Sequence, residues 1–145
     1  MNLELIKEEI KQDEGFRNSM YRDHLGFATI GYGHLVLPTD KFKEGVKYSV
    51  KELDKVFEYD FQIAYQDAVS LAKSHNIDSY ECVEILIEMC FQLGKPKVMK
   101  FKKMFEALSK KDYYTAHLEM LDSVWAKKHT PARAHRLSQK MKKLT

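Results

Sequence analysis

The chain has 145 residues, enough for one domain of ordinary size, and its 44% hydrophobic content suffices for a packed core. With six glycines, three prolines and no low-complexity tract or repeat, the sequence excludes a disordered or repetitive protein. The formal net charge is +3, and no apolar run is long enough to span a membrane. We therefore expect a protein made in the cytoplasm, with no signal peptide and no stable membrane insertion.

Positive charge is concentrated near the end of the chain. Residues 127–145 contain seven Lys and Arg and no Asp or Glu, which leaves 17 basic and 21 acidic residues in the rest. This asymmetry indicates an anionic partner, which could be nucleic acid, a membrane surface or an anionic wall polymer. A solvated basic helix explains the same pattern without any partner.

The two cysteines, Cys82 and Cys90, are predicted to be free thiols. They are eight positions apart in one predicted helix, which separates them by about 12 Å of helical rise. A disulfide requires Cα atoms within about 7 Å, so the two cannot bridge each other. No spacing typical of metal ligands occurs in the sequence, and we expect neither a metal nor another cofactor.

The first part of the chain predicts a helix followed by a hairpin. Apolar residues at helical spacing indicate a helix over residues 2–13, and Gly15 is a suitable residue to end it. Residues 20–23 and 27–33 are short, aromatic and β-branched, with a turn between them that contains Gly26. They are predicted to form the two strands of a hairpin.

The remainder of the chain predicts helices. Ser49 and Glu52 form a capping box, and the apolar stripe that follows continues the helix to about residue 73. Thr130 is a predicted N-cap, followed by Pro131 at the first helical position. Four further helices are predicted at residues 79–92, 97–109, 112–124 and 130–142.

These elements predict an α+β fold in a single domain, residues 1–145. A small lobe with the hairpin, about residues 14–55, is joined by the long helix to a mostly helical lobe. The helical lobe is expected to comprise about residues 1–13 and 65–145.

Two acids and a hydroxyl in the hairpin region are candidate catalytic groups. Glu14 ends the first helix, Asp23 ends the first strand, and Thr29 lies on the returning strand. Glycosidic cleavage requires a protonated acid for the leaving oxygen and a carboxylate on the opposite face of the sugar. A neighbouring hydroxyl can hold the attacking water. From spacing alone, a solvent-facing acid before a helix cap is the more common explanation of Glu14.

Several strings of residues together resemble the phage-type lysozymes of glycoside hydrolase family 24, a family with a lysozyme-like fold. The resemblance extends over nearly the whole chain. Its motifs are Asp13-Glu14-Gly15, Tyr21-Arg22-Asp23, Gly26, the segment from Thr29 to Leu35, Phe91-Gln92-Leu93-Gly94, and Trp125, Thr130, Pro131, Arg133 and Arg136.

The resemblance implies a role for each matched residue. Glu14 would be the general acid, while Asp23 and Thr29 would position and activate water. Substrate-binding roles are implied for Leu35, Phe91 and Gln92. Supporting roles are implied for Arg133, which would pair with Glu14, and for His34 and Asp60, which would pair with each other.

The implied activity is that of an inverting muramidase, which cleaves the β-1,4 bond between N-acetylmuramic acid and N-acetylglucosamine in peptidoglycan. A monomeric phage endolysin fits this activity, with the cell wall rather than nucleic acid as its partner. It would remain in the host cytoplasm until a separate pore-forming protein released it to the periplasm. The alternatives are a catalytically idle wall-binding or virion module, a nucleic-acid binder and a lytic transglycosylase.

The sequence departs from the family pattern in two places. The segment between Leu35 and Ser49 is shorter than in longer family members. Met104 and Glu119 stand where the resemblance would place polar sugar contacts, so no such role is assigned to them. Trp125 is predicted to be a core residue rather than a sugar platform.

Overall fold

The computed structural model describes all residues from 1 to 145, which divide into two compact units. One unit comprises residues 4–63, and the other comprises residues 1–3 and 64–145. The predicted α+β class is confirmed, because helices accompany one small antiparallel sheet. No helix combines the length and the apolar character that crossing a membrane requires.

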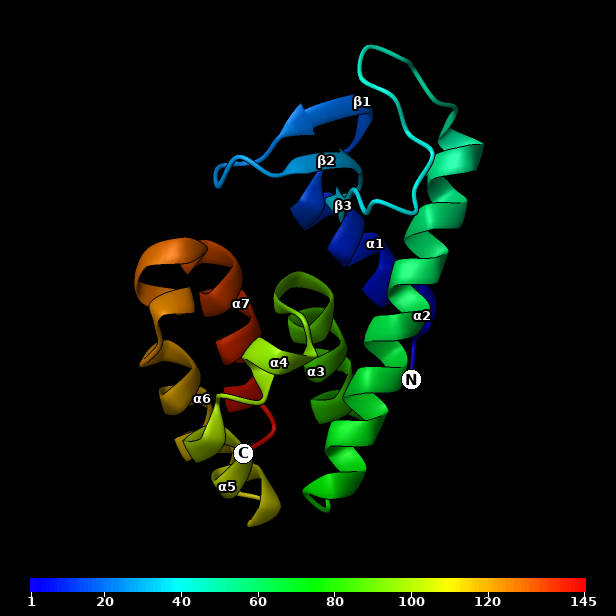
Figure 1. The fold of residues 1–145 in the computed structure, drawn as a ribbon. Coiled ribbons are helices and arrows are strands. Elements are labelled where there is room, and N and C mark those ends of the chain that lie inside the picture. The colour runs from blue at the N-terminus through cyan, green and yellow to red at the C-terminus, as the bar shows by residue number, and fades with distance from the viewer. The chain divides into compact units, whose positions relative to one another are not determined.

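The smaller unit contains helix α1 (Leu3–Glu14) and a three-stranded sheet in the order β1-β2-β3. The strands are β1 (Arg17–Arg22), β2 (Ala28–Gly31) and β3 (His34–Leu35). In Figure 1, α1 lies beside the strands, and the segment after β3 loops over to the start of α2. The hairpin was predicted, but the predicted bounds of its strands, residues 20–23 and 27–33, were wrong: β1 ends before Asp23, and a turn after Gly31 separates β2 from a short third strand that was not predicted.

Helix α2 (Val50–Ser74) begins at the predicted capping box and contributes residues to both units. The Ser49 hydroxyl accepts a hydrogen bond from the backbone N–H of Glu52 at 3.1 Å. In return, the Glu52 carboxylate accepts from the Ser49 backbone N–H at 3.3 Å. The first half of α2 contacts α1, since Lys11 pairs with Asp54 at 3.4 Å. Because residues 4–63 form one compact unit, α1 belongs with the sheet, although the sequence analysis grouped residues 1–13 with the helical lobe.

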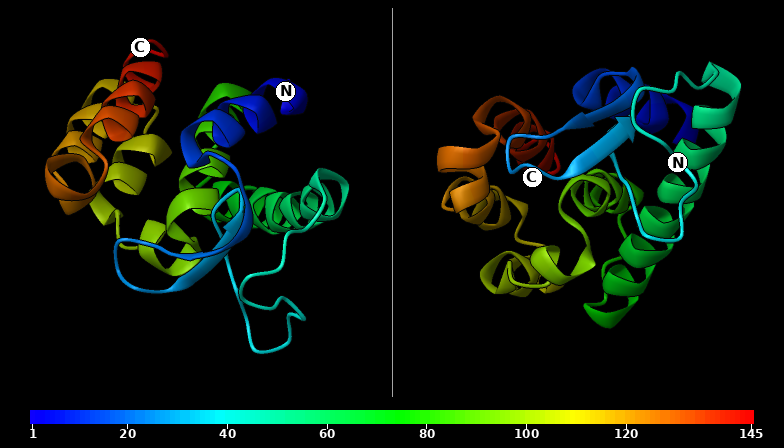
Figure 2. Two further views of the ribbon diagram at one scale, coloured as in Figure 1. Left: turned by 90° about the horizontal axis from the view of Figure 1, so that it is seen from above. Right: turned by 45° about the horizontal axis from the view of Figure 1, so that its top comes forward.

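The larger unit consists of helices around α3 (Tyr80–Leu93), which is buried along most of its length. The remaining helices are α4 (Lys95–Val98), α5 (Lys102–Ser109), α6 (Tyr113–Leu121), the π-helix η1 (Trp125–His129) and α7 (Pro131–Lys142). Figure 2 shows α6 and α7 packed side by side within this unit. Cys82 and Cys90 are free and buried on α3, and burial raises the pKa of each thiol to about 12.

Two predicted helices are interrupted in the structure. The helix predicted over residues 97–109 is interrupted between Val98 and Lys102. Phe101, in this gap, is not helical, and its ring packs edge-on against that of Trp125 with 5.9 Å between the ring centres. The helix predicted over residues 112–124 ends earlier, at Leu121, and the π-helix η1 follows it. Its defining bond runs from the Thr130 N–H to the Trp125 carbonyl at 3.0 Å. Thr130 occupies the predicted N-cap position, but its side chain makes no capping bond.

Candidate active site

Glu14 is the last residue of α1, at the point where Gly15 turns the chain out of the helix. Gly15 has φ = 72°, and its N–H donates to the Lys11 carbonyl at 3.0 Å, which closes the last helical turn. The Glu14 carboxyl lies directly against Gly33, in the turn between β2 and β3. A Cβ added to Gly33 would lie 2.6 Å from Oε1 of Glu14. The absence of a side chain at Gly33 therefore provides the space for the candidate acid.

Asp23 and Thr29 are both held by the backbone of Phe27. Oδ1 of Asp23 accepts from the N–H groups of Leu25 at 2.9 Å and Phe27 at 2.8 Å. The Thr29 hydroxyl donates to the carbonyl oxygen of Phe27 at 2.9 Å. The register pairs Tyr21 with Thr29 and Arg22 with Ala28, and the bond from the Asp23 N–H to the Phe27 carbonyl extends it to Asp23 and Phe27. Because side chains alternate along a strand, Asp23 and Thr29 share one face of the sheet.

Both candidate carboxylates affect the pKa of Tyr21. Burial is the main cause that raises the pKa of Tyr21 above its ordinary value. The nearby carboxylates of Glu14 and Asp23 raise it further, while the Arg17 guanidinium opposes the rise. That guanidinium lies 4.6 Å from the centre of the Tyr21 ring. The phenol of Tyr21 therefore lies near both candidate carboxylates, which the sequence analysis did not predict.

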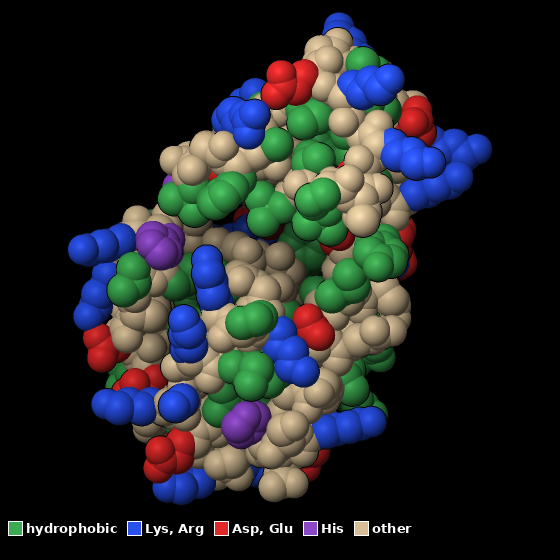
Figure 3. Space-filling model, viewed as in Figure 1, with side chains coloured by type: hydrophobic (Ala, Val, Ile, Leu, Met, Phe, Trp, Pro, Cys, Tyr) green, Lys and Arg blue, Asp and Glu red, His purple; other side chains and the backbone are tan.

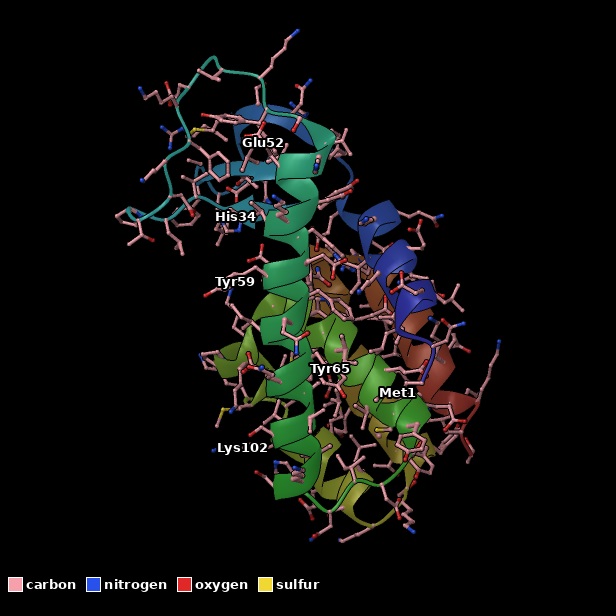
Figure 4. All side chains as sticks on the ribbon, turned by 90° about the vertical axis from the view of Figure 1, so that its right-hand side faces the viewer. Met1, His34, Glu52, Tyr59, Tyr65 and Lys102 are labelled. Carbon is pink, nitrogen blue, oxygen red and sulfur yellow. The ribbon has the colours of Figure 1, made fainter.

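His34 is bound by two aspartates rather than by one. Its Nδ1 lies 2.7 Å from Oδ2 of Asp60 on α2, and its Nε2 lies 2.8 Å from Oδ2 of Asp40. Figure 4 shows His34 beside α2, between the levels of Glu52 and Tyr59. The structure thus contains the predicted contact with Asp60. Asp40 was missed, because the segment between strand and helix gives no periodic signal in the sequence.

The two aspartates raise the pKa of His34 against the opposing effect of burial. Burial alone would lower this pKa, but the hydrogen bonds to Asp60 and Asp40 outweigh it. For Asp40, burial would raise the pKa, yet the bonds from the Leu37 N–H and from His34 lower it overall. With both ring nitrogens facing carboxylates, the imidazolium is the form that satisfies both contacts.

We expect His34→Gln to destabilise the protein most in mildly acidic solution. Because the folded pKa is raised, the stabilisation is complete below the unfolded value of about 6.5 and is lost as the pH rises through the folded pKa. Each charged hydrogen bond contributes about 1.5 to 3 kcal/mol. The measurement is urea unfolding at several pH values between about 5 and 9. His24→Gln, at an exposed turn position, is the control. A stability difference that does not change with pH would contradict the charged pairing.

The other predicted site residues occupy both units. Leu35 ends β3 in the smaller unit, and its side chain is exposed. Phe91 and Gln92 lie at the end of α3, and Arg133 lies in α7, all in the larger unit. The predicted pairing of Arg133 with Glu14 would join the two units, and it stays a prediction.

Gln92 is held by two neighbours in the larger unit. Its Oε1 accepts from the indole N–H of Trp125 at 3.1 Å, and its Nε2 donates to the Thr130 hydroxyl at 2.9 Å. This bond occupies the hydroxyl that was predicted to cap α7. Trp125 is buried, as predicted. The Gln92 amide is thus fixed in orientation, with one N–H still available.

A pocket of about 540 Å³ lies in the same unit, with Met104, Glu119 and Trp125 among its lining residues. Several lysines also line it: Lys97, Lys100, Lys102 and Lys103. In Figure 3, Lys and Arg side chains surround hydrophobic ones over this part of the unit. The two positions that depart from the family pattern therefore line a basic, partly apolar pocket.

An acid at a helix end and a second carboxylate near a hydroxyl fit the mechanism of glycoside hydrolases, which use one carboxyl group as the acid and a second one on the other side of the sugar. The sequence profile of the family described as phage lysozyme matches residues 11–141. The chain therefore belongs to the phage lysozyme family, and it is an enzyme with lysozyme activity.

Individual relatives agree with this assignment. The chain is 30% identical to a probable T4-type lysozyme 2 of Dictyostelium discoideum, over 91% of this chain and 90% of that protein. It is 28% identical to the pre-baseplate central spike protein Gp5 of Enterobacteria phage T4, over 92% of this chain and 27% of that protein. It is 24% identical to the peptidoglycan hydrolase gp36 of Pseudomonas phage phiKMV, over 93% of this chain and 15% of that protein.

Proposed function

We propose that this lysozyme hydrolyses the β-1,4 bond between N-acetylmuramic acid and N-acetylglucosamine in peptidoglycan, with inversion at the anomeric carbon. Glu14 protonates the leaving oxygen, and Asp23 with Thr29 activates the attacking water. The observation that carries the proposal is the attachment of Asp23 and Thr29 to the backbone of one residue, Phe27. No cofactor takes part in this reaction.

The bonds to Phe27 determine which atoms can hold the water. A carbonyl oxygen only accepts hydrogen bonds, so the Thr29 hydroxyl must donate its proton to Phe27. Its oxygen then offers lone pairs to a water. Because Oδ1 of Asp23 already accepts two backbone N–H groups, Oδ2 is the oxygen suited to receive a water proton. A water that donates to both side chains keeps its own lone pair for attack on the sugar.

We expect the first product of cleavage to be the α-anomer. Single displacement by water inverts the β-linkage, whereas a covalent intermediate on Asp23 would retain it. Proton NMR of the first turnovers, recorded before mutarotation, distinguishes the two. A β-anomer as the first product would identify Asp23 as a nucleophile and would contradict the role of Thr29 in holding the attacking water.

Purified peptidoglycan tests the activity itself. The parent chain is expected to clear a wall suspension and to release reducing ends, and Asp23→Asn is expected to do neither at a comparable rate. Binding without cleavage would instead indicate an idle wall-binding or virion module. Products with anhydro sugars, detected by mass spectrometry, would indicate a lytic transglycosylase.

We further propose that the enzyme acts as a monomeric endolysin in host cell lysis. It would be held in the host cytoplasm until a separate pore-forming protein gives it access to the periplasm. Membership of the phage lysozyme family supports this role. Expression in bacteria with and without a pore-forming protein tests it, with rapid lysis expected only when both are present. Lysis at the same rate without the pore would contradict the requirement for a partner.

A further inference from the structure

Phe27 combines a backbone that holds two candidate catalytic groups with a side chain that faces solvent. Its N–H donates to Asp23 at 2.8 Å, and its carbonyl accepts from Thr29 at 2.9 Å. The same carbonyl accepts from the Asp23 backbone N–H at 2.9 Å. Phe27 is nevertheless 58% exposed. A displacement of this residue would be transmitted directly to both groups.

The register of the sheet places further apolar side chains beside Phe27. Thr29 pairs with Leu35, and the bond from the Val36 N–H to the Ala28 carbonyl at 3.0 Å continues the ladder. Extended by one residue beyond the strands, this register sets Leu37 opposite Phe27. From the alternation of side chains we infer that Phe27, Leu35 and Leu37 lie on the face that carries Asp23 and Thr29. We name these three residues the apolar strip. Leu35 and Leu37 are each 52% exposed.

The apolar strip has the chemistry of a sugar-binding surface. A pyranose ring presents C–H groups on its faces, and N-acetyl groups add methyls. Ligand sites typically combine apolar and aromatic walls with a few polar groups that fix orientation. Here the polar groups are Asp23 and Thr29, and they adjoin the strip on the same face. Figure 3 shows exposed hydrophobic side chains over the hairpin that carries Phe27.

We propose that Phe27 is a positioning residue whose ring stacks on a pyranose ring of the glycan next to the scissile bond, with Leu35 and Leu37 extending the contact. This inference rests on the proposed muramidase function. The backbone of Phe27 keeps Asp23 and Thr29 in register with the sugar that its ring carries. Phe27 thereby links substrate binding, through its ring, to water activation, through its backbone.

Kinetics on soluble peptidoglycan fragments test the proposal through three variants. Phe27→Ala removes the ring but keeps the backbone bonds, so KM is expected to rise about tenfold while kcat changes little. A tenfold change corresponds to about 1.4 kcal/mol. Phe27→Tyr preserves a stacking ring and is expected to restore KM. Val50→Ala removes a side chain of similar exposure, 55%, at the start of α2, and is expected to leave KM unchanged.

Direct binding separates this proposal from the proposed reaction. N-acetylglucosamine oligomers are titrated by NMR into Glu14→Gln, with and without Phe27→Ala. Weaker binding in the double variant supports the strip even if the parent fails to cleave peptidoglycan. An unchanged dissociation constant, or a fall in kcat and melting temperature with KM unchanged, would overturn the proposal. The latter result would show that the ring only stabilises the hairpin.

Discussion

Replacement of Glu14 by glutamine is expected to abolish nearly all lysis of bacterial walls while leaving the fold intact. The side chain keeps its size, so it still fits against Gly33, but an amide cannot deliver a proton to the leaving oxygen. General acid–base catalysis contributes about 10² to 10⁴-fold to the rate, and a loss in that range is expected. The release of reducing ends from purified peptidoglycan measures it. Activity within a few-fold of the parent would show that another group is the acid.

Gly33→Ala is an independent perturbation of the same acid. Its Cβ would lie 2.6 Å from Oε1 of Glu14, closer than real Cβ contacts come, so the carboxyl must move. Gly33 also has φ = 75°, a conformation that strains an alanine. Gly45→Ala is the matched control, because its φ is similar, 78°, and nothing lies within 4 Å of the added Cβ. We expect both variants to lose stability. Only Gly33→Ala is expected also to lose activity per folded molecule.

The sequence predicted those parts of the fold and site that depend on residues close together in the chain. The capping box at Ser49 and Glu52 and the helix end at Gly15 are each confirmed by local hydrogen bonds. The hairpin followed from two short aromatic and β-branched segments on either side of a turn, and the long helix followed from the periodicity of its apolar residues. The family resemblance, rather than spacing, selected Glu14 and Asp23 among many acids, because a single acid at a helix end carries no chemistry by itself.

Contacts that depend on irregular segments or on the tertiary arrangement could not be predicted in the same way. Asp40 reaches His34 from an irregular segment, so no periodic pattern indicates it. Thr130 has the residue type of an N-cap, yet Gln92, 38 positions away, occupies its hydroxyl. The role of Phe27 lies in its backbone and depends on the register of the hairpin. In each case the tertiary arrangement determines a partner that local propensity does not specify.

Glu88 is the clearest example, because it is a charged residue inside α3, a helix that is buried along most of its length. Only 1% of its side chain is exposed. Its Oε1 accepts from Arg136 at 3.2 Å, and its Oε2 lies 3.5 Å from Nζ of Lys140, both on α7. Burying a carboxylate is strongly unfavourable unless it is paired and hydrogen-bonded. The basic residues of α7 therefore have a structural role within this unit, besides any attraction to an anionic wall.

The simultaneous change of Arg136→Met and Lys140→Met is expected to destabilise the protein by about 3 to 5 kcal/mol, as when a buried charge loses its partners. Glu88→Gln alone should have a smaller effect, because the side chains of Arg136 and Lys140 are 39% and 36% exposed and can be hydrated. Urea unfolding measures both differences. Adding Glu88→Met to the double variant removes the buried charge and should recover most of the lost stability, since apolar replacements of buried ion pairs are often neutral. If the triple variant were no more stable than the double variant, lost packing of the long basic side chains would be the cause, and the electrostatic account of Glu88 would be wrong.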